Sequence, residues 1–397
     1  MLENKVIIWG GDNYNVMGLL RQLANNNIDV FFLIDGKANG CATKSKHCKL
    51  YHETLNINSG YEYLLSNCID LQYKPIIITP SDDIIEFIDQ HRNELIKYFI
   101  IPGCEKQGLL SKYNNKNNMV ELAEKSGFIV PKSKKCTANQ LPSAINFPCI
   151  LKPSHSCYGL KNEFKYKICN NLSNLTSTLK YVRKNSEFIL QEYIPKESVA
   201  LVYGCRLNNG TTITAGTFVK DRFTDNGDGS HGYLTSKYPY GINCKQIEKF
   251  LNEIDYHGLF SFEYGLYKGK AYFFEVNLRN DGTSHYFYQS GANIPLAYVV
   301  NCAGLDYSQI STKVMMDSWY IDELFDCENI IERNLSFRQW KRDKLKATVF
   351  KYYDKDDEGP WQYVMKRRWK QIAQDLILRR FRLYIVYIYD KIGLKIK

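Results

Sequence analysis

One predicted hairpin constrains the fold of this chain more than any other segment. Residues 260–264 and 272–279 are rich in aromatic residues, and a short glycine-containing turn separates them, a pattern typical of two paired strands. Glu275 and Asn277 are two positions apart and share one face of their strand, and the hairpin can bring Glu263 beside them. Two carboxylates and an amide oxygen suit magnesium. The alternative is a solvated amphipathic hairpin, but the apolar neighbours favour burial, where unpaired carboxylates are costly.

The N-terminal part of the chain alternates short apolar runs with helical patterns. The apolar runs lie at 5–9, 30–34 and 75–78, and the helical patterns lie at 16–24 and 84–99. This alternation predicts a parallel sheet with helices on its faces, and we assign residues 1–110 to that domain. The glycine pair after the first run lacks the spacing of a dinucleotide-binding fingerprint, so we interpret it as a tight strand-to-helix turn.

The rest of the chain changes pattern twice. Residues 111–198 combine a helix at 116–126 with a strand at 147–153 and predict a small α+β unit. Residues 199–310 are dominated by strand signals between glycine turns and predict a mainly antiparallel sheet. Residues 311–397 form a C-terminal extension. The predicted fold class is therefore α/β and α+β in successive domains.

Charge and cysteine usage narrow the functional classes. The net charge is +10, but residues 361–397 contain ten Lys or Arg and only two acidic residues, so most of the surplus belongs to the tail. No nucleic-acid-reading motif accompanies the charge, and we expect no nucleic-acid partner. None of the 12 cysteines forms a Cys-x-x-Cys pair, so zinc and iron–sulfur sites lack their usual spacing. Without a secretion signal or a bilayer-long apolar run, we expect a cytoplasmic protein with reduced thiols.

Five motifs, in order over about residues 1–310, resemble the ATP-grasp superfamily. They are the strand end at 79–83, the domain entry at 111–132, the lysine-bearing strand at 147–153, the hinge at 191–195 and the hairpin around Glu263 and 275–279. Within that superfamily the chain resembles the ligases related to D-aspartate ligase and to the carbamoyl-phosphate-synthase-like group, most closely at 275–285. The resemblance implies a pre-ATP-grasp domain, a small lid subdomain, and a large subdomain that carries the metal site.

The resemblance also implies roles for individual residues. Magnesium would be bound by Glu263, Glu275 and Asn277, and the transferred phosphate and substrate carboxylate would face Arg279, Lys220 and Arg222. ATP would be held by Lys112, Lys152, Ser154, Lys165, Gln191, Glu192, Tyr193, Ile194 and Glu197. Lys152 suits phosphate because it ends an apolar strand directly before a proline. For Glu197, an exposed loop residue is an equally good interpretation, and for Lys220 and Arg222 a solvated turn is nearly as good.

Three expectations concern loops near these residues. The segment Ser154–Gly159 would close over phosphate, although it contains less glycine than the corresponding loop of many family members. The segment 280–285 would read the substrate, and we interpret His285 as a hydrogen-bonded structural residue rather than a base.

The implied activity is that of an ATP- and magnesium-dependent, ADP-forming carboxylate–amine ligase. The γ-phosphoryl group would move to a carboxylate to give an acyl phosphate, which an amine then attacks. Two magnesium ions are expected, with manganese as an alternative. The substrates would be an amino acid or similar carboxylate and an amine, one of them carried on a glycan or cell-wall precursor. Alternatives are a phosphotransferase on the same fold and a non-catalytic nucleotide-binding protein. The sequence leaves open the substrates, a homodimer, and contact of the basic tail with the inner face of the membrane.

Overall fold

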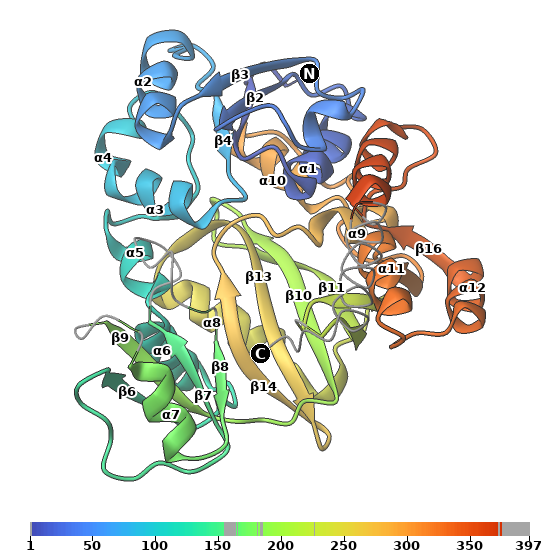
Figure 1. Ribbon diagram of the computed structural model, residues 1–397. Helices are drawn as coiled ribbons and strands as arrows, with labels where there is room; N and C mark the ends of the chain where they lie inside the picture. Colours follow the sequence, from blue (N-terminus) through green and yellow to red (C-terminus); the bar gives the residue numbers. More distant parts are fainter. Residues whose placement is uncertain are drawn as a thin grey trace, which may run out of the picture.

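The computed structural model describes residues 2–154, 164, 166–180, 182, 186–225, 227–371 and 374. These residues form three sheets. In Figure 1 the four-stranded N-terminal sheet lies above a large central sheet, and a second four-stranded sheet lies at the lower left. This arrangement confirms the mixed α/β and α+β architecture that the sequence predicts.

The N-terminal sheet is parallel, with strand order β3-β2-β1-β4. Its elements are β1 (Val6–Gly10), α1 (Tyr14–Ala24), β2 (Val30–Asp35), η1 (Ala42–Lys44), β3 (Leu50–Thr54), α2 (Ile57–Asn67), β4 (Ile76–Ile78), α3 (Asp82–Gln90) and α4 (Arg92–Leu95). Every residue of β1 is buried, as expected of a central parallel strand that is covered on both faces. The predicted parallel sheet is confirmed.

Two elements of this domain differ from the sequence expectation. The edge strand β3 has no apolar run, because four of its five residues are exposed, so periodicity does not reveal it. The helix predicted at 84–99 is two helices, because His91 leaves the helical conformation with φ −107° and ψ 14°.

The small subdomain has an antiparallel sheet of order β6-β9-β7-β8. Its elements are α5 (Leu109–Asn114), α6 (Lys116–Ser126), β6 (Ser133–Thr137), β7 (Cys149–Pro153), β8 (Lys167–Cys169), α7 (Leu172–Leu179) and β9 (Glu187–Glu192). Helix α6 has the predicted bounds, since the Asn115 side chain caps its start and Gly127, at φ 93°, ends it. It packs against α8 and β14 and so fixes the subdomain to the central sheet.

The central sheet contains eight strands and is antiparallel except for the pair β15–β16. Its strands are β5 (Gly103–Cys104), β10 (Ser198–Arg206), β11 (Thr212–Phe223), β12 (Gly229–Thr235), β13 (Tyr256–Tyr267), β14 (Lys270–Asn277), β15 (Ser318–Ile321) and β16 (Ala347–Phe350). The accompanying helices are η2 (Pro239–Gly241), α8 (Cys244–Glu253), α9 (Ser284–Gln289), α10 (Ile294–Cys302), α11 (Glu323–Ile331) and α12 (Phe337–Lys346). Because β15 pairs with β12, the C-terminal extension completes this sheet.

Two apolar cores cover the faces of the central sheet. On one face Phe262, Phe273 and Val276 pack with residues of α6 and α8. On the other face Tyr203 and Phe218 pack with residues of α1, α9 and α10. The N-terminal domain therefore rests directly on the central sheet. Within the described residues, no helix combines the length and the apolar character needed to cross a membrane.

Candidate functional site

The hairpin β13–β14 brings the predicted metal ligands together. Glu263 lies directly opposite Glu275, and Ser261 lies opposite Asn277. Their strand neighbours Phe262 and Val276 are buried in the core behind the sheet, whereas the two glutamates and Asn277 are half-buried. The three oxygen-bearing side chains therefore face away from that core, on one side of the sheet.

A β-bulge adjusts this hairpin to the site. The register shifts between Glu263 and Tyr264, so Phe274 has no partner in the opposite strand. Phe273 can then pack into the core while Phe274 and Glu275 both line a cavity, which strict alternation would not allow. Gly265 makes room for this arrangement, because a Cβ atom there would lie 2.0 Å from the Phe274 ring.

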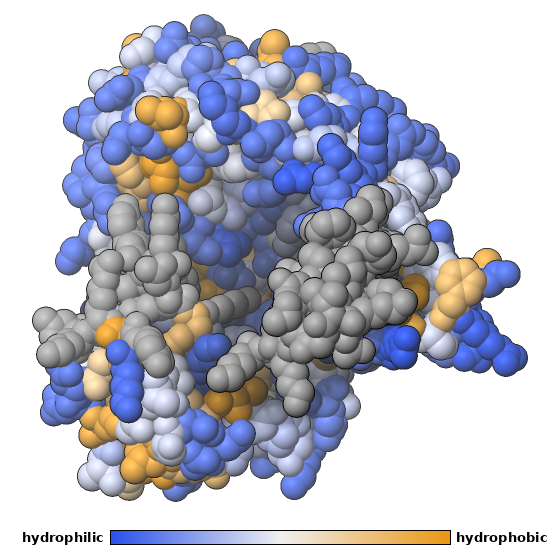
Figure 2. Space-filling model, in the orientation of Figure 1, coloured by the Kyte–Doolittle hydropathy of each residue, from blue (hydrophilic) through white to orange (hydrophobic). Residues whose placement is uncertain are grey.

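The cavity lies between the small subdomain and the central sheet and has a volume of about 190 Å³. It is lined by Lys116, Ile150, Lys152, Tyr166, Ile168, Tyr193, Ile194, Lys196, Gly227, Asp228, Glu263, Phe274 and Glu275. Figure 2 shows the molecule hollowed between the N-terminal domain and the small subdomain, with hydrophilic residues deep in the hollow. The structure thus gathers five predicted site residues around one space: Lys152, Tyr193, Ile194, Glu263 and Glu275.

Lys152 enters the cavity from β7, whose residues alternate between the core and the cavity. Its Nζ donates to Gln191 Oε1 at 3.1 Å and lies 5.6 Å from the centroid of the Phe274 ring. Burial lowers the pKa of Lys152 to about 8; Lys116 and Lys196 lower it too, while Glu275 and Glu263 oppose them. A cluster of three lysines beside two carboxylates suits a polyanion that carries a divalent cation.

Lys220 pairs with the first glutamate of the hairpin. Its Nζ lies 3.3 Å from Glu263 Oε2. Burial alone would raise the pKa of Glu263, but Lys220 and Lys196 outweigh it and lower that pKa. Burial alone would lower the pKa of Lys220, but Glu263 and Asp281 raise it. Both groups are therefore charged near neutral pH.

Glu275 differs from Glu263 because it makes no hydrogen bond or ion pair with any described residue. A half-buried carboxylate beside a second carboxylate is unfavourable unless a cation joins them. The part of the chain that the structure describes has no group of three His, Cys, Asp or Glu side chains fit to hold a metal. Magnesium, however, is commonly bound by one or two carboxylates together with substrate phosphates, and the pair Glu263 and Glu275 fits that donor set.

Arg279 holds the third predicted ligand. Its guanidinium forms a two-pronged pair with Asp82, with Nε–Oδ1 at 2.5 Å and Nη2–Oδ2 at 2.8 Å. Nη2 also lies 3.2 Å from Asn277 Oδ1. The Asn277 amide group donates to Ser261 Oγ at 3.1 Å and faces Asp281 Oδ2 at 3.5 Å. Burial alone would lower the pKa of Arg279, but Asp82 raises it, so this link between the N-terminal domain and the hairpin is permanently charged.

Four of the predicted residues that do not line the cavity contact other parts of the chain. Lys112 is exposed on α5, with its Nζ 5.3 Å from the Tyr113 ring centroid. Glu192 is exposed, and its Oε2 accepts from the Lys132 N–H at 3.4 Å. Glu197 accepts from the Lys268 N–H at 3.3 Å and so supports the hairpin turn.

Arg222 is the fourth of these residues, and it contacts the C-terminal helices. Its guanidinium pairs with Asp326 on α11 and Asp343 on α12, each at 2.7 Å. His285, in contrast, sits as a structural residue: Arg21 Nη1 lies 3.2 Å from its Nε2, and burial lowers its pKa well below the usual range.

Some predicted residues fall outside the described ones. They are Lys165, the segment 155–159 of the expected phosphate loop, and the tail at 375–397. Ser154 is described: it is buried, and its Oγ accepts from Asn117 Nδ2 at 2.8 Å.

Sequence reasoning missed Lys116, Lys196, Ile150 and Phe274, which all line the cavity. Lys116 is the first residue of α6, and its Nζ donates to Pro153 O at 3.4 Å, beside the end of the lysine-bearing strand. Its place at a predicted helix start, between Asn115 and an apolar pattern, is a signal that could have identified it.

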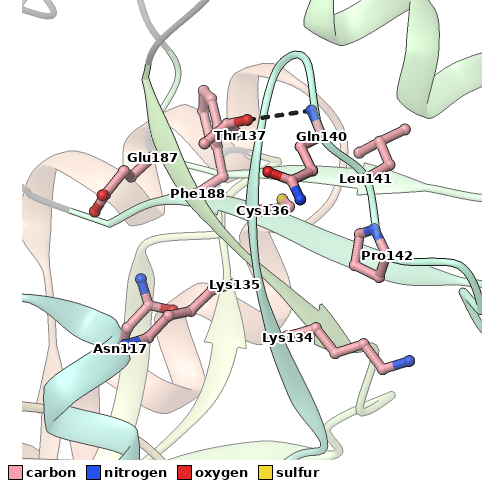
Figure 3. A pocket seen from close by; sticks show the side chains of 10 residues that line it. All are labelled: Asn117, Lys134, Lys135, Cys136, Thr137, Gln140, Leu141, Pro142, Glu187 and Phe188. Carbon is pink, nitrogen blue, oxygen red and sulfur yellow. Dashed lines mark hydrogen bonds between the residues drawn. The ribbon is translucent and has the colours of Figure 1, made fainter.

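A second surface pocket does not carry this chemistry. It lies over β6 and β9 of the small subdomain (Figure 3). Lys134 donates to Ala144 O at 2.8 Å, and Lys135 pairs with Glu121 at 3.2 Å. Among the described residues of its lining, Glu187 is the only carboxylate, so this lining does not show the paired oxygen ligands of the hairpin.

Comparison with known proteins adds independent findings. No family model matches the chain. The D-aspartate ligase of Enterococcus faecium is 25% identical over 244 residues, which cover 57% of this chain and 58% of that protein, less than two thirds of its length. A structure of N5-carboxyaminoimidazole ribonucleotide synthetase with ADP has a TM-score of 0.64 at 15% identity and covers 84% of this chain and 86% of its own. The L-amino acid ligase from Bacillus licheniformis has a TM-score of 0.61 at 12% identity, with 80% and 79% covered.

The two structural likenesses cover 84% and 80% of this chain. The resemblance to the ATP-grasp superfamily that the motifs indicated is confirmed, and the chain has the ATP-grasp fold.

Proposed function

We propose that this chain is an ATP- and magnesium-dependent, ADP-forming ligase that joins a carboxylate to an amine by way of an acyl phosphate. The observation that carries the proposal is the facing pair Glu263 and Glu275 in one cavity with Lys152 and Lys116. The names of similar proteins support it, since one relative is a D-aspartate ligase and a protein of similar fold is an L-amino acid ligase.

The cavity offers separate places for the parts of ATP. Ile150, Ile168, Ile194 and Phe274 give apolar walls suited to the base. Lys152, Lys116 and Lys196 give three ammonium groups for the phosphates. Glu263, Glu275 and Asn277 would hold magnesium, which when bound neutralises phosphate charge during transfer.

The remaining polar residues fit the transfer step. Lys220 stays charged beside Glu263 and would stabilise negative charge on the transferred phosphoryl group. Arg279, fixed by Asp82, would orient Asn277 and present the substrate carboxylate with a fixed positive charge. An amine would then attack the acyl phosphate and expel phosphate. Positioning and cations would supply most of the rate, because this chemistry needs little covalent help from the protein.

The carboxylate substrate we propose is an amino acid or a similar small acid, with the amine carried on a glycan or a cell-wall precursor. Sequence similarity to D-aspartate ligase supports the first part. Two magnesium ions are expected for such a reaction, and Glu263, Glu275 and Asn277 are the residues that would hold them.

The proposal is tested by incubating the full chain with ATP, magnesium and pooled amino acids and separating ADP from AMP. ADP and phosphate that form only when a carboxylate and an amine are both present support ligation. A phosphorylated product that persists would instead identify a phosphotransferase. Nucleotide binding without turnover under any substrate pool would identify a binding protein.

A further inference from the structure

Helix α12 lies at the periphery of the molecule. In Figure 1 it is drawn at the right-hand edge, beyond α11. One face of the helix joins it to the central sheet: Asp343 is buried and pairs with Arg222 at 2.7 Å, and Gln339 donates to the same carboxylate at 2.7 Å. Within the described part of the chain, the opposite face of α12 points to solvent.

Two large apolar side chains lie on this outward face. Phe337 is 64% exposed and Leu345 is 80% exposed. They are two helical turns apart, so they lie on one side of the helix with Lys341 between them. Figure 2 shows an apolar patch among hydrophilic residues where Figure 1 draws α12. Both side chains would gain free energy by leaving water for an apolar surface.

The same helix is strongly basic. Half of its ten residues are Lys or Arg, and all of these are exposed: Arg338, Lys341, Arg342, Lys344 and Lys346. None of them forms an ion pair with the described part of the chain. Asp343 is the only acidic residue of α12, and it is already paired with Arg222. The outward face therefore combines unopposed positive charge with exposed apolar side chains.

This combination favours an anionic lipid surface over other partners. A helix that lies on a membrane places its apolar side chains among the lipids and its cations near the headgroups. Trp340, whose ring centroid lies 4.9 Å from Lys344 Nζ, is of the residue type that prefers the membrane–water boundary. A nucleic acid would use the cations but would leave Phe337 and Leu345 in water.

We propose that α12 docks the protein on the surface of a bilayer that contains anionic lipids. Phe337 and Leu345 enter the boundary between headgroups and acyl chains, while the exposed cations of α12 contact lipid phosphates. With ten residues, the helix is far shorter than the roughly 20 residues that spanning a bilayer takes, so it lies flat on the surface. The inference does not depend on the proposed function, because no residue of α12 lines the nucleotide cavity.

Flotation of the full chain with vesicles tests this contact. The vesicles are made of phosphatidylcholine alone or of phosphatidylcholine with phosphatidylglycerol. The first variant is F337S/L345S. Its matched control is L55S/L71S, because Leu55 and Leu71 are 83% and 74% exposed and lie in the N-terminal domain.

We expect wild type and L55S/L71S to bind the anionic vesicles equally and the neutral vesicles weakly. F337S/L345S should bind the anionic vesicles at least about tenfold more weakly, because it removes the apolar contact with the lipids. Leu345→Ser alone, at the more exposed of the two positions, should fold normally and lower the affinity about threefold.

The cations are varied separately. R338Q/K341Q removes two outward charges from α12, and its control K49Q/K97Q removes two charges from exposed positions of the N-terminal domain. At low salt R338Q/K341Q should bind the anionic vesicles about tenfold more weakly than its control does. This difference should shrink as added salt screens the charges.

Several outcomes would overturn the inference. One is that wild type does not float with anionic vesicles, and another is that F337S/L345S floats as well as wild type, since the contact would then lie on another segment. A third is that wild type binds duplex DNA more tightly than anionic vesicles at the same salt. The last is that light scattering shows a wild-type dimer that F337S/L345S dissociates while neither protein binds vesicles, because α12 would then contact a second copy of the chain.

Discussion

Lys220 and Arg222 are two residues apart on β11, yet they belong to different regions of the molecule. Lys220 pairs with one glutamate in the cavity between the small subdomain and the central sheet. Arg222 pairs with Asp326 and Asp343 from the C-terminal helices. The bulge between these two positions of β11 helps direct the two side chains to different surroundings.

The two regions balance their charges differently. Asp326 has 0% side-chain exposure, and the Arg222 guanidinium makes a two-pronged pair with it. In the cavity Lys220 and Glu263 remain 19% and 24% exposed, and Glu275 has no ion-pair partner among the described residues. The cluster around Arg222, in which each charged side chain has an ion-pair partner, stabilises the fold. The cluster in the cavity contains a carboxylate without an ion-pair partner and can therefore bind a ligand.

The largest effect should come from the unpaired carboxylate. Glu275→Gln should lower ADP formation about a thousandfold, because it removes a charged metal ligand, while the urea midpoint stays within error of wild type. The exposed Glu253 on α8 offers the control E253Q, which should keep full activity. If E275Q releases ADP as fast as wild type, the hairpin is not part of the active site.

Arg222→Met should affect stability rather than chemistry. It leaves buried Asp326 without its cation, and such a loss costs about 3–5 kcal/mol, measured as a lower urea midpoint. Lys220→Met should do the reverse: a small stability change with ADP formation reduced about 10- to 100-fold. If both variants lose the same activity per folded molecule, the two regions do not differ in function.

The two candidate phosphate lysines can be separated next. Lys116→Met should weaken magnesium–ADP binding about tenfold in calorimetry, because Lys116 lines the cavity beside Lys152. Lys112→Met should bind like wild type, since Lys112 is exposed on α5. If Lys112→Met weakens magnesium–ADP binding more than Lys116→Met does, Lys112 has the phosphate-binding role that the sequence resemblance implied.

The smallest effect concerns pH. Because burial lowers the pKa of Lys152 to about 8, this lysine is charged below pH 8 and loses its charge as pH rises through 8. Magnesium–ADP affinity should fall about fivefold between pH 7 and 9, as the charged fraction falls. Lys152→Arg, whose guanidinium stays charged, should show a flat profile over this range. A wild-type affinity that is constant between pH 7 and 9 would contradict the assignment.

Local patterns predicted most of the fold. The hairpin followed from a turn between two strand-like segments, and α6 followed from a helical pattern that a terminal glycine ends. The sequence did not reveal β3, because an exposed edge strand carries no apolar run. It also did not reveal the break at His91. The sequence did not single out Lys116 either, whose place in the cavity lining depends on how the start of α6 packs against the end of β7.

The sequence by itself determined which side chains share a strand face and where short elements begin and end, since these depend on residues only a few positions apart. Only the tertiary structure decided that Arg222 would join Asp326 and Asp343, which lie 104 and 121 residues further along the chain. It likewise decided that a bulge would place Phe274 beside Glu275 in the cavity. Long-range pairing and bulge placement depend on how separate elements pack, and no local periodicity records that packing.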